Sequence, residues 1–315
     1  MNMINKPKFW DKKNSKLLSL FFQPLTIPIR INNLISNIKP KKKFKKIKSI
    51  CVGNIYLGGT GKTPSTIKIF DILKKNGLKV VMGKKNYDSH EDEKIVLEKN
   101  GKLISDQNRT KVFKRSIEKN YECIIFDDGL QDLTVDYDIK IVCFDSLNWI
   151  GNGNLIPSGP MREKLTSLKK YDVIFLKNYN EDLRMILNEI KFHNPKIEIF
   201  KTNYKILNIE KFDLNTKYIC VSGIGNPASF KKILLDNKFQ IIDEIIFPDH
   251  MLYSKNDINY IEDRARKINA KIITTEKDYV KLSKLVNTQI DFLDISLEID
   301  NEKSLIDLLN LKLHE

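Results

Sequence analysis

One glycine-rich hexapeptide, GGTGKT at positions 58 to 63, restricts the folds open to this chain more than any other feature. It follows an apolar run, Lys48 to Asn54, and it opens a stretch with helical spacing, Thr63 to Asn76. At such a strand-to-helix turn, glycines let backbone N–H groups approach a phosphate, and the lysine reaches the β- and γ-phosphates. The threonine hydroxyl is placed for Mg²⁺. The predicted nucleotide-binding residues are Gly58, Gly59, Thr60, Gly61, Lys62 and Thr63.

This phosphate loop is a variant of the strict pattern GxxxxGK[ST]. That pattern requires glycine at position 56, where the chain has Tyr56. The alternative is a chance GGTGKT in a flexible loop. The strand–loop–helix setting favours the nucleotide site.

Short apolar runs and helical segments alternate after the loop. Continuous apolar runs of four to eight residues are typical of buried parallel strands covered by helices on both faces. We therefore predict an α/β chain whose core is a P-loop NTPase-like parallel sheet with helices on both faces. The predicted strands span 48–54, 78–82, 121–126, 139–144, 172–176 and 197–200.

A second alternating set begins near Lys217 and predicts a smaller α/β lobe. The polar stretch from Thr202 to Lys217 is the best candidate hinge. We expect an N-terminal segment at 1–47, a P-loop core domain at 48–203 and the C-terminal lobe at 204–315. The strands predicted in this lobe span 218–222, 240–247, 271–275 and 290–295, and its helices span 228–237, 256–269 and 304–313.

The positive charge is concentrated in the first 50 residues. They hold 13 Lys and Arg and one acid, whereas the other 265 residues hold 41 basic and 39 acidic side chains. Seven of these lysines lie within 39–48, directly after an apolar, aromatic stretch at 17–35. Each Lys or Arg near an anionic leaflet contributes about 1 kcal/mol. The segment therefore predicts an amphipathic, membrane-associating surface.

Other interpretations of this segment are weaker. A membrane-spanning helix needs about 20 predominantly apolar residues, and Pro24, Pro28 and Arg30 interrupt the stretch. A signal peptide would need a small-residue cleavage site after the apolar part. Nucleic-acid binding would need a basic face that continues into the folded body. The remaining alternative is a helix packed on the core, followed by a solvated, charged linker.

Two acidic pairs are candidates for chemistry. Asp127 and Asp128 follow the strand predicted at 121–126, where P-loop proteins place a carboxylate directed at a metal. A turn-forming Asp-Gly is the alternative. Asp92 and Glu93 lie on a polar stretch, where isolated acids are more often a solvated charge run.

Two further segments could line a site. A loop rich in Gly and Pro, GNGNLIPSGPMRE at 151–163, ends in Arg162 and Glu163, and such loops often carry binding residues. Asp249 and His250 follow a strand of the second lobe. A cleft between the lobes could bring His250 to the acids of the first lobe as part of a base pair.

The order of these motifs resembles the tetraacyldisaccharide 4′-kinase family, the lipid A 4′-kinases of Gram-negative bacteria. A P-loop occurs in many folds, but its combination with the later motifs in this order is highly specific. The resemblance runs from about Trp10 to Leu282. It rests on GNIYLGGTGKTP, DE, DDGLQ, GNGNLIPSGPMRE, GIGNPASF, FPDH and TTEKDYVKL.

The resemblance implies transfer of the ATP γ-phosphate to the 4′-hydroxyl of a tetraacylated glucosamine disaccharide 1-phosphate, giving lipid IVA. It implies ATP and Mg²⁺ as cofactors and a peripheral location at the cytoplasmic face of the bacterial inner membrane. The expected partners are the lipid substrate and an anionic membrane surface. Neither a nucleic acid nor an obligate protein partner is expected.

Residue roles carry over to matching positions only. The resemblance implies that Asp92 is a general base paired with His250. The other catalytic positions it implies are Lys62, Asp127 and Asp128. The positions it implies for phosphate or substrate binding are Arg109, Arg162 and Gln131, and those for Mg²⁺ are Thr63, Glu93 and Asp127.

The chain departs from the family pattern in three places. GKKNY at 83–87 stands where the family usually has SRGYG, and Lys85 cannot reproduce the bidentate fork of an arginine. The chain between Tyr87 and Asp92 is shorter than usual. Asp132 follows DDGLQ, where the family typically has His. These changes concern lipid-headgroup contacts and base geometry more than nucleotide binding.

Two other classes of protein are alternatives. A P-loop enzyme or GTPase-like accessory protein acting on a small soluble substrate would leave the N-terminal segment without a function. Residues 275–278 (TEKD) are only a loose match to the NKxD element that guanine specificity requires. A non-enzymatic, membrane-recruited nucleotide switch would leave Asp92, His250 and the loop at 151–163 unexplained.

Cysteine spacing adds one expectation. The four cysteines lie far apart, without a CxxC pair, in apolar runs. This spacing predicts buried free thiols in a reduced protein rather than disulfides or a zinc site.

Overall fold

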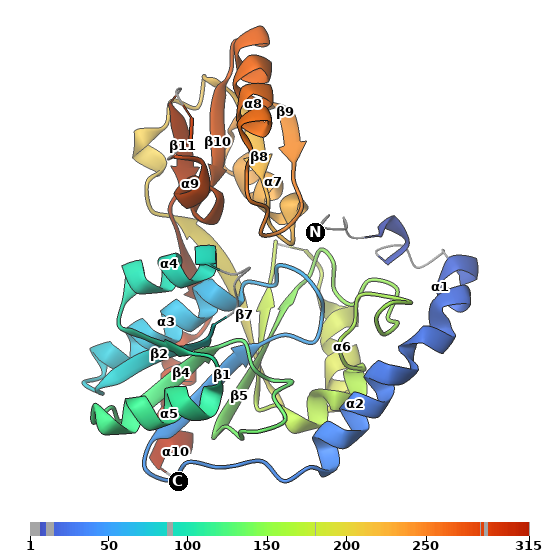
Figure 1. Ribbon diagram of the computed structural model, residues 1–315, viewed down its shortest axis with the longest axis vertical. Coiled ribbons are helices and arrows are strands. Elements are labelled where there is room, and N and C mark those ends of the chain that lie inside the picture. The colour runs from blue at the N-terminus through green and yellow to red at the C-terminus, as the bar shows by residue number, and fades with distance from the viewer. Residues whose placement is uncertain are drawn as a thin grey trace. The chain divides into compact units, whose positions relative to one another are not determined.

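The computed structural model describes residues 7–10, 16–86, 91–179, 181–283, 285–286 and 289–314, which form two compact units (Figure 1). The P-loop unit comprises the described residues up to 86, then 100–203 and 297–314. The C-terminal unit comprises 91–99 and the described residues of 204–296. Two segments, 91–99 and 297–314, thus group differently from the domains expected with a single boundary at 204. The shortened region before Asp92 includes 87–90, which lie outside the described residues.

An eight-stranded sheet forms the core of the P-loop unit, in the order β12-β7-β6-β5-β1-β4-β2-β3. All neighbouring strands from β7 to β3 pair in parallel. Every residue of β4 and β6 is buried, which explains why each strand is continuously apolar up to its last residue, Asp127 in β4 and Lys177 in β6. The strands are β1 (Lys48–Gly53), β2 (Val80–Lys85), β3 (Leu103–Asp106), β4 (Cys123–Asp127), β5 (Ile139–Asp145), β6 (Val173–Lys177), β7 (Glu198–Ile206) and β12 (Ile295–Ile299).

Helices cover both faces of this sheet, as the sequence predicts. One apolar cluster joins Phe113 of α5 and Ile190 of α6 to alternate strand residues such as Val81. The next residue of β2, Met82, points to the opposite face of the sheet. There its side chain and that of Phe70 of α3 both lie against Gly101. The helices of this unit after the N-terminal segment are α3 (Lys62–Lys75), α5 (Arg109–Glu118), the 3₁₀ helix η3 (Leu165–Lys170), α6 (Arg184–His193) and α10 (Glu302–His314).

The C-terminal unit is built on a four-stranded parallel sheet in the order β11-β10-β8-β9. Ile219 and Val221 of β8 pack with α8, and the alternate residue Cys220 packs with α7, so both faces are covered. Its strands are β8 (Lys217–Ser222), β9 (Gln240–Ile246), β10 (Lys271–Thr275) and β11 (Ile290–Leu293). Its helices are α4 (Glu91–Asn100), η4 (Ile209–Lys211), α7 (Pro227–Asp236), α8 (Lys255–Lys267) and α9 (Glu276–Leu282).

The structure differs from the sequence-based prediction at two elements, the hinge and the last strand of the C-terminal lobe. The expected hinge at 202–217 begins inside β7, which continues to Ile206. The single strand expected at 290–295 is two strands, β11 and β12, which belong to different sheets. Asp294 lies between the two strands. Its N–H donates to Asn208 Oδ1 at 3.0 Å and its carbonyl accepts from the N–H of Leu207 at 2.8 Å, so its backbone bonds to the segment after β7. The periodicity of side chains in the sequence cannot reveal that the chain passes from one sheet to the other at this point.

The N-terminal segment contains short helices with a largely exposed apolar surface. None of the described helices is long and apolar enough to cross a membrane. The helices are η1 (Lys8–Trp10), α1 (Lys16–Phe22), η2 (Gln23–Thr26) and α2 (Ile27–Ile38). Their most exposed large apolar side chains are Leu17, Leu18, Leu20, Phe21, Leu25, Ile27, Ile31, Leu34, Ile35 and Ile38.

Helix α1 is hydrogen-bonded to the Gly/Pro-rich loop of the same unit. The buried Ser19 hydroxyl donates to the carbonyl of Ser158 at 3.0 Å and accepts from Asn154 Nδ2 at 2.7 Å. Ser158 Oγ donates back to the carbonyl of Ser19 at 2.6 Å. Farther along this loop, the carbonyl of Pro160 accepts from the N–H of Leu57, which precedes the phosphate loop, at 2.7 Å. The loop at 151–163 therefore connects the N-terminal helices to the phosphate loop.

Candidate active site

The phosphate loop joins β1 to α3 at the carboxyl end of the sheet. Gly58 and Gly61 have backbone φ angles of 138° and 83°, which residues other than glycine rarely adopt. Asn54 Nδ2 donates to the carbonyl of Gly58 at 3.1 Å and to Thr60 Oγ1 at 3.0 Å. The loop is therefore held in shape by a residue that the sequence analysis did not single out. Lys62 and Thr63 begin α3, as the motif predicts.

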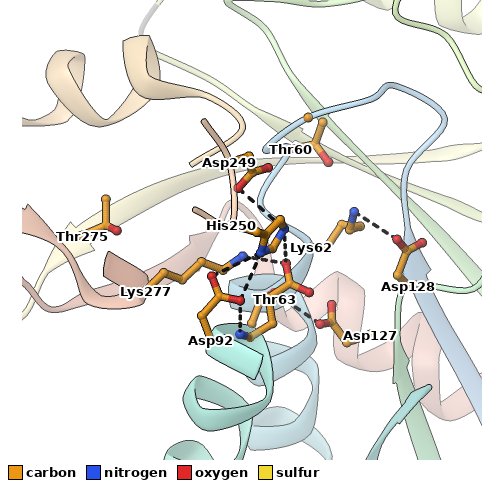
Figure 2. A network of polar contacts seen from close by, with 12 residues as sticks. Thr60, Lys62, Thr63, Asp92, Asp127, Asp128, Asp249, His250, Thr275 and Lys277 are labelled. Atoms are coloured by element: carbon orange, nitrogen blue, oxygen red, sulfur yellow. Dashed lines mark hydrogen bonds and ion pairs between the residues drawn. The ribbon is translucent and has the colours of Figure 1, made fainter. Parts of the chain in front are cut away.

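Asp127 ends β4, directly beside β1, and its side chain is completely buried. Its Oδ2 accepts a hydrogen bond from Thr63 Oγ1 at 3.3 Å, and Lys84 Nζ lies 2.7 Å from the same oxygen. Figure 2 shows Thr63 and Asp127 turned toward one another. The sequence analysis assigns no role to Lys84, which lies in GKKNY, the segment that departs from the family pattern.

Asp128 is surrounded by cationic groups. It has a φ angle of 65°, and its Oδ2 lies 3.2 Å from Lys62 Nζ and 3.3 Å from Arg162 Nη1. The ion pair with Lys62 is visible in Figure 2. Burial raises the pKa of Asp128, but the charges of Lys62, Arg162 and Arg109 lower it more, so the net pKa lies well below the usual range. Asp128 is therefore ionised at neutral pH.

Gln131 links three parts of this site. Its Nε2 donates to Glu163 Oε1 at 2.9 Å and to the carbonyl of Asn54 at 3.0 Å, and its Oε1 accepts from Arg162 Nη1 at 3.3 Å. Glu163 also accepts from Tyr171 at 2.7 Å. The structure thus brings Gln131 and Arg162 together beside Asp128.

Arg109 lies in a different environment from the one expected of a phosphate ligand. Its side chain is only 6% exposed, and its Nη1 lies 2.7 Å from Asp132 Oδ2. Its Nη2 donates to the carbonyl of Asp128 at 2.8 Å. A Cβ placed on Gly129 would meet Arg109 Nε at 2.7 Å, so the guanidinium packs directly against this turn. This geometry favours a role in shaping the Asp128 turn.

A second cluster lies wholly within the C-terminal unit. His250 Nδ1 is 3.1 Å from Asp92 Oδ1, and Lys281 Nζ is 3.3 Å from Asp92 Oδ2. Figure 2 shows the imidazole and the carboxylate facing each other. Burial raises the pKa of Asp92, but the hydrogen bond from His250 and the charges of Lys277 and Lys281 outweigh this, so the net pKa is lowered. Asp92 is buried on α4, so it is not part of a solvated charge run.

Glu93 is paired with a lysine in the same cluster. Lys277 Nζ lies 2.6 Å from Glu93 Oε1, and His250 Nε2 lies 3.9 Å from that oxygen. Burial lowers the pKa of Lys277, but Glu93, Asp249 and Asp92 raise it more, so the lysine is held charged. Lys277 and Lys281 had no assigned role in the sequence analysis. Their i, i+4 spacing on α9 is the signal that places them on one helix face.

The donor set at Thr63 and Asp127 fits a magnesium ion. Among the described residues, no group of three or more His, Cys, Asp and Glu is arranged to hold a metal. Mg²⁺ in phosphate sites, however, commonly takes one or two protein oxygens and completes its shell with phosphates and water. The Thr63 hydroxyl and the Asp127 carboxylate supply two such oxygens, which lie 3.3 Å apart.

The parallel sheet, the phosphate loop and the acid at the end of the adjacent strand define a P-loop nucleoside triphosphate-binding protein. The family model described as Tetraacyldisaccharide-1-P 4'-kinase matches residues 16–314. The chain belongs to this family. Family membership confirms the resemblance, the kinase activity and the role in lipid A biosynthesis that the motifs imply, and it excludes the two alternative classes.

Individual relatives agree with this assignment. A tetraacyldisaccharide 4'-kinase of Pelagibacter ubique is 47% identical over 314 residues, covering 99% of each chain. One from Rickettsia typhi is 32% identical over 324 residues, covering 98% of this chain and 97% of the relative. The crystal structure of LpxK from Aquifex aeolicus in complex with ATP shares the fold, with a TM-score of 0.68 and 21% identity. That match covers 94% of this chain and all of the other.

Proposed function

We propose that this chain binds ATP and Mg²⁺ at its phosphate loop and transfers the γ-phosphate to the 4′-hydroxyl of a tetraacylated glucosamine disaccharide 1-phosphate. The observation that carries this proposal is the convergence of Lys62, Thr63, Asp127 and Asp128 at the carboxyl end of β1 and β4. The names of the relatives supply the acceptor. The ATP bound to the Aquifex protein supports the choice of nucleotide.

The proposed phosphate site works mainly by positioning and charge neutralisation, which phosphoryl transfer requires most. The backbone N–H groups of the loop and Lys62 would bind the β- and γ-phosphates. Arg162, held by Gln131 and Asp128, would face the transferred phosphate. Arg109 would act indirectly, by holding the turn that carries Asp128 in place.

Thr63 and Asp127 are the residues we assign to magnesium. When bound, the ion would neutralise charge on the β- and γ-phosphates. We assign Glu93 a supporting role near His250, because Lys277 already balances its charge at 2.6 Å.

Asp92 is the general base of the proposed reaction, and His250 orients it. A carboxylate with a lowered pKa is a weak base. A loose phosphoryl-transfer transition state nevertheless places little demand on base strength, and protein kinases also use an Asp for this proton. The hydrogen bond from His250 Nδ1 directs the Asp92 carboxylate and, together with the charges of Lys277 and Lys281, keeps it ionised.

We assign the exposed apolar side chains of α1 and α2 to the surface of the inner membrane, on its cytoplasmic side. The lysine-rich run after α2 is partly attached to the P-loop unit. The N–H of Lys42 donates to the carbonyl of Thr134 at 2.9 Å, and Phe44 stacks on Phe113 with ring centroids 4.3 Å apart. Lys45 and Lys46 are exposed and available to anionic headgroups.

Phosphate transfer from γ-labelled ATP to the tetraacylated disaccharide 1-phosphate in detergent micelles tests the proposal. Labelled lipid should form with the wild type and with Lys74→Ala, which alters an exposed lysine of α3, and should vanish with Lys62→Ala. If the folded, ATP-binding wild type produced no labelled lipid, the proposed acceptor would be rejected.

A further inference from the structure

Lys84 is a buried cation at the phosphate site, within the segment where the sequence departs from the family pattern. Its side chain is 5% exposed, near the carboxyl end of β2. Strand β2 pairs with β4, with Gly83 opposite Phe126, so Lys84 lies beside Asp127. The two charged groups are 2.7 Å apart.

Lys84 changes the net charge of the site around Asp127, where the phosphates of the nucleotide would bind. Asp127 Oδ2 lies next to both Lys84 Nζ and the hydroxyl of Thr63, the residue placed for the metal-bound phosphates. An uncompensated carboxylate in such a buried site would repel the phosphates strongly, because low polarity magnifies charge interactions. Lys84 balances the negative charge of Asp127 without a metal ion.

We propose that Lys84 is a built-in counter-charge of Asp127 that allows ATP to bind without Mg²⁺ and that reduces the metal dependence of binding. This makes Lys84 a positioning residue that acts through Asp127. The inference rests on ATP binding as proposed above. It does not depend on the lipid acceptor or on the membrane surface.

Equilibrium binding of a fluorescent ATP analogue, in EDTA and at saturating Mg²⁺, tests the inference. Lys84→Met should weaken binding about tenfold or more in EDTA but less than about threefold with Mg²⁺, since the metal then supplies the missing positive charge. The matched control is Lys177→Met, which removes another buried lysine from a strand end, 3.9 Å from Asp145. It should stay within about twofold of wild type in both media.

A double variant keeps the test decisive if Lys84→Met does not fold. Lys84→Met/Asp127→Asn removes both charges and leaves the site neutral, a change that buried pairs often tolerate. Its metal-free affinity should return to within about threefold of wild type, and Mg²⁺ should no longer tighten binding.

Two results would overturn the inference. One is Lys84→Met weakening ATP equally with and without Mg²⁺, or not at all. The other is metal-free binding by the double variant remaining tenfold weaker than wild type. A wild type that binds no ATP even with Mg²⁺ would instead contradict the proposed function, so the two failures are distinguishable.

Discussion

Asp92 and His250 stand 158 positions apart in the chain, yet Nδ1 of His250 lies 3.1 Å from the Asp92 carboxylate inside a single compact unit. The sequence analysis expected a cleft between two lobes to bring them together. The structure instead groups the start of α4 with the C-terminal unit, so closure of two domains is not needed to form the pair.

Removing either member of this pair should slow the chemical step. We expect Asp92→Asn and His250→Ala each to lower kcat by about 10²- to 10⁴-fold, the usual range for a positioned base. His193→Ala, on α6 of the other unit, should leave kcat unchanged. Steady-state kinetics with saturating ATP and lipid provide the measurement. Activities of both variants within about threefold of wild type would contradict the base assignment.

Arg109 and Arg162 should respond differently to substitution. Arg109→Ala removes one partner of a buried ion pair with Asp132, so we expect the free energy of unfolding to fall by about 2–4 kcal/mol. Arg162→Ala affects a side chain that is 26% exposed and should cost less than about 1 kcal/mol while lowering kcat/KM. Urea denaturation and kinetics separate the two effects. A stable Arg109→Ala with a raised KM for ATP would instead favour direct phosphate binding.

The hydrogen bonds between α1 and the Gly/Pro-rich loop should support activity. Ser19→Ala breaks contacts with Ser158 and Asn154, and this loop in turn contacts the phosphate loop through Pro160. We expect kcat/KM for ATP to fall about three- to tenfold, corresponding to loss of about 1 kcal/mol of positioning. Ser19→Thr should retain most activity. Ser36→Ala, on α2, is the control, and equal kinetics for Ser19→Ala and Ser36→Ala would show that α1 does not support the loop.

The exposed apolar side chains of α1 should determine binding to lipid surfaces. Leu20 and Phe21 are 68% and 75% exposed. Leu20→Ser/Phe21→Ser should weaken binding to anionic phospholipid vesicles by tenfold or more, because about 1.5–3 kcal/mol is lost for each large apolar side chain. Protein stability should barely change, since neither side chain is buried. Vesicle sedimentation that is equal for the variant and the wild type would place the membrane contact elsewhere.

Lys177 should give the stability of the protein a specific pH dependence. Burial lowers the pKa of Lys177 to about 7, although the nearby Asp145 opposes this shift. Between pH 7 and the unfolded pKa near 10.4, the unfolded state binds more protons than the folded state, so stability should rise with pH. Lys177→Met should flatten this rise by about 2–4 kcal/mol in urea unfolding at pH 7 and pH 10. Parallel curves for the wild type and the variant would contradict the shifted pKa.

Much of the fold followed from local patterns in the sequence. The loop at 58–63 depends on neighbouring glycines and on a helix start, and a buried parallel strand such as β4 is marked by a run of consecutive apolar residues, here Cys123 to Phe126. Both signals lie within a few consecutive residues, so the alternation of strands and helices, and the placement of Asp127 and Asp128 at a strand end, could be predicted. The motif order was equally sufficient for the family.

Tertiary structure alone decided which charges meet. Asp92 pairs with His250 inside the C-terminal unit, Arg109 pairs with Asp132, and Lys84 pairs with Asp127 from a neighbouring strand. Each of these pairs depends on strand order and chain return over tens to hundreds of residues. Periodicity records which face of an element is buried, but it contains no information about the residue on the element packed against that face.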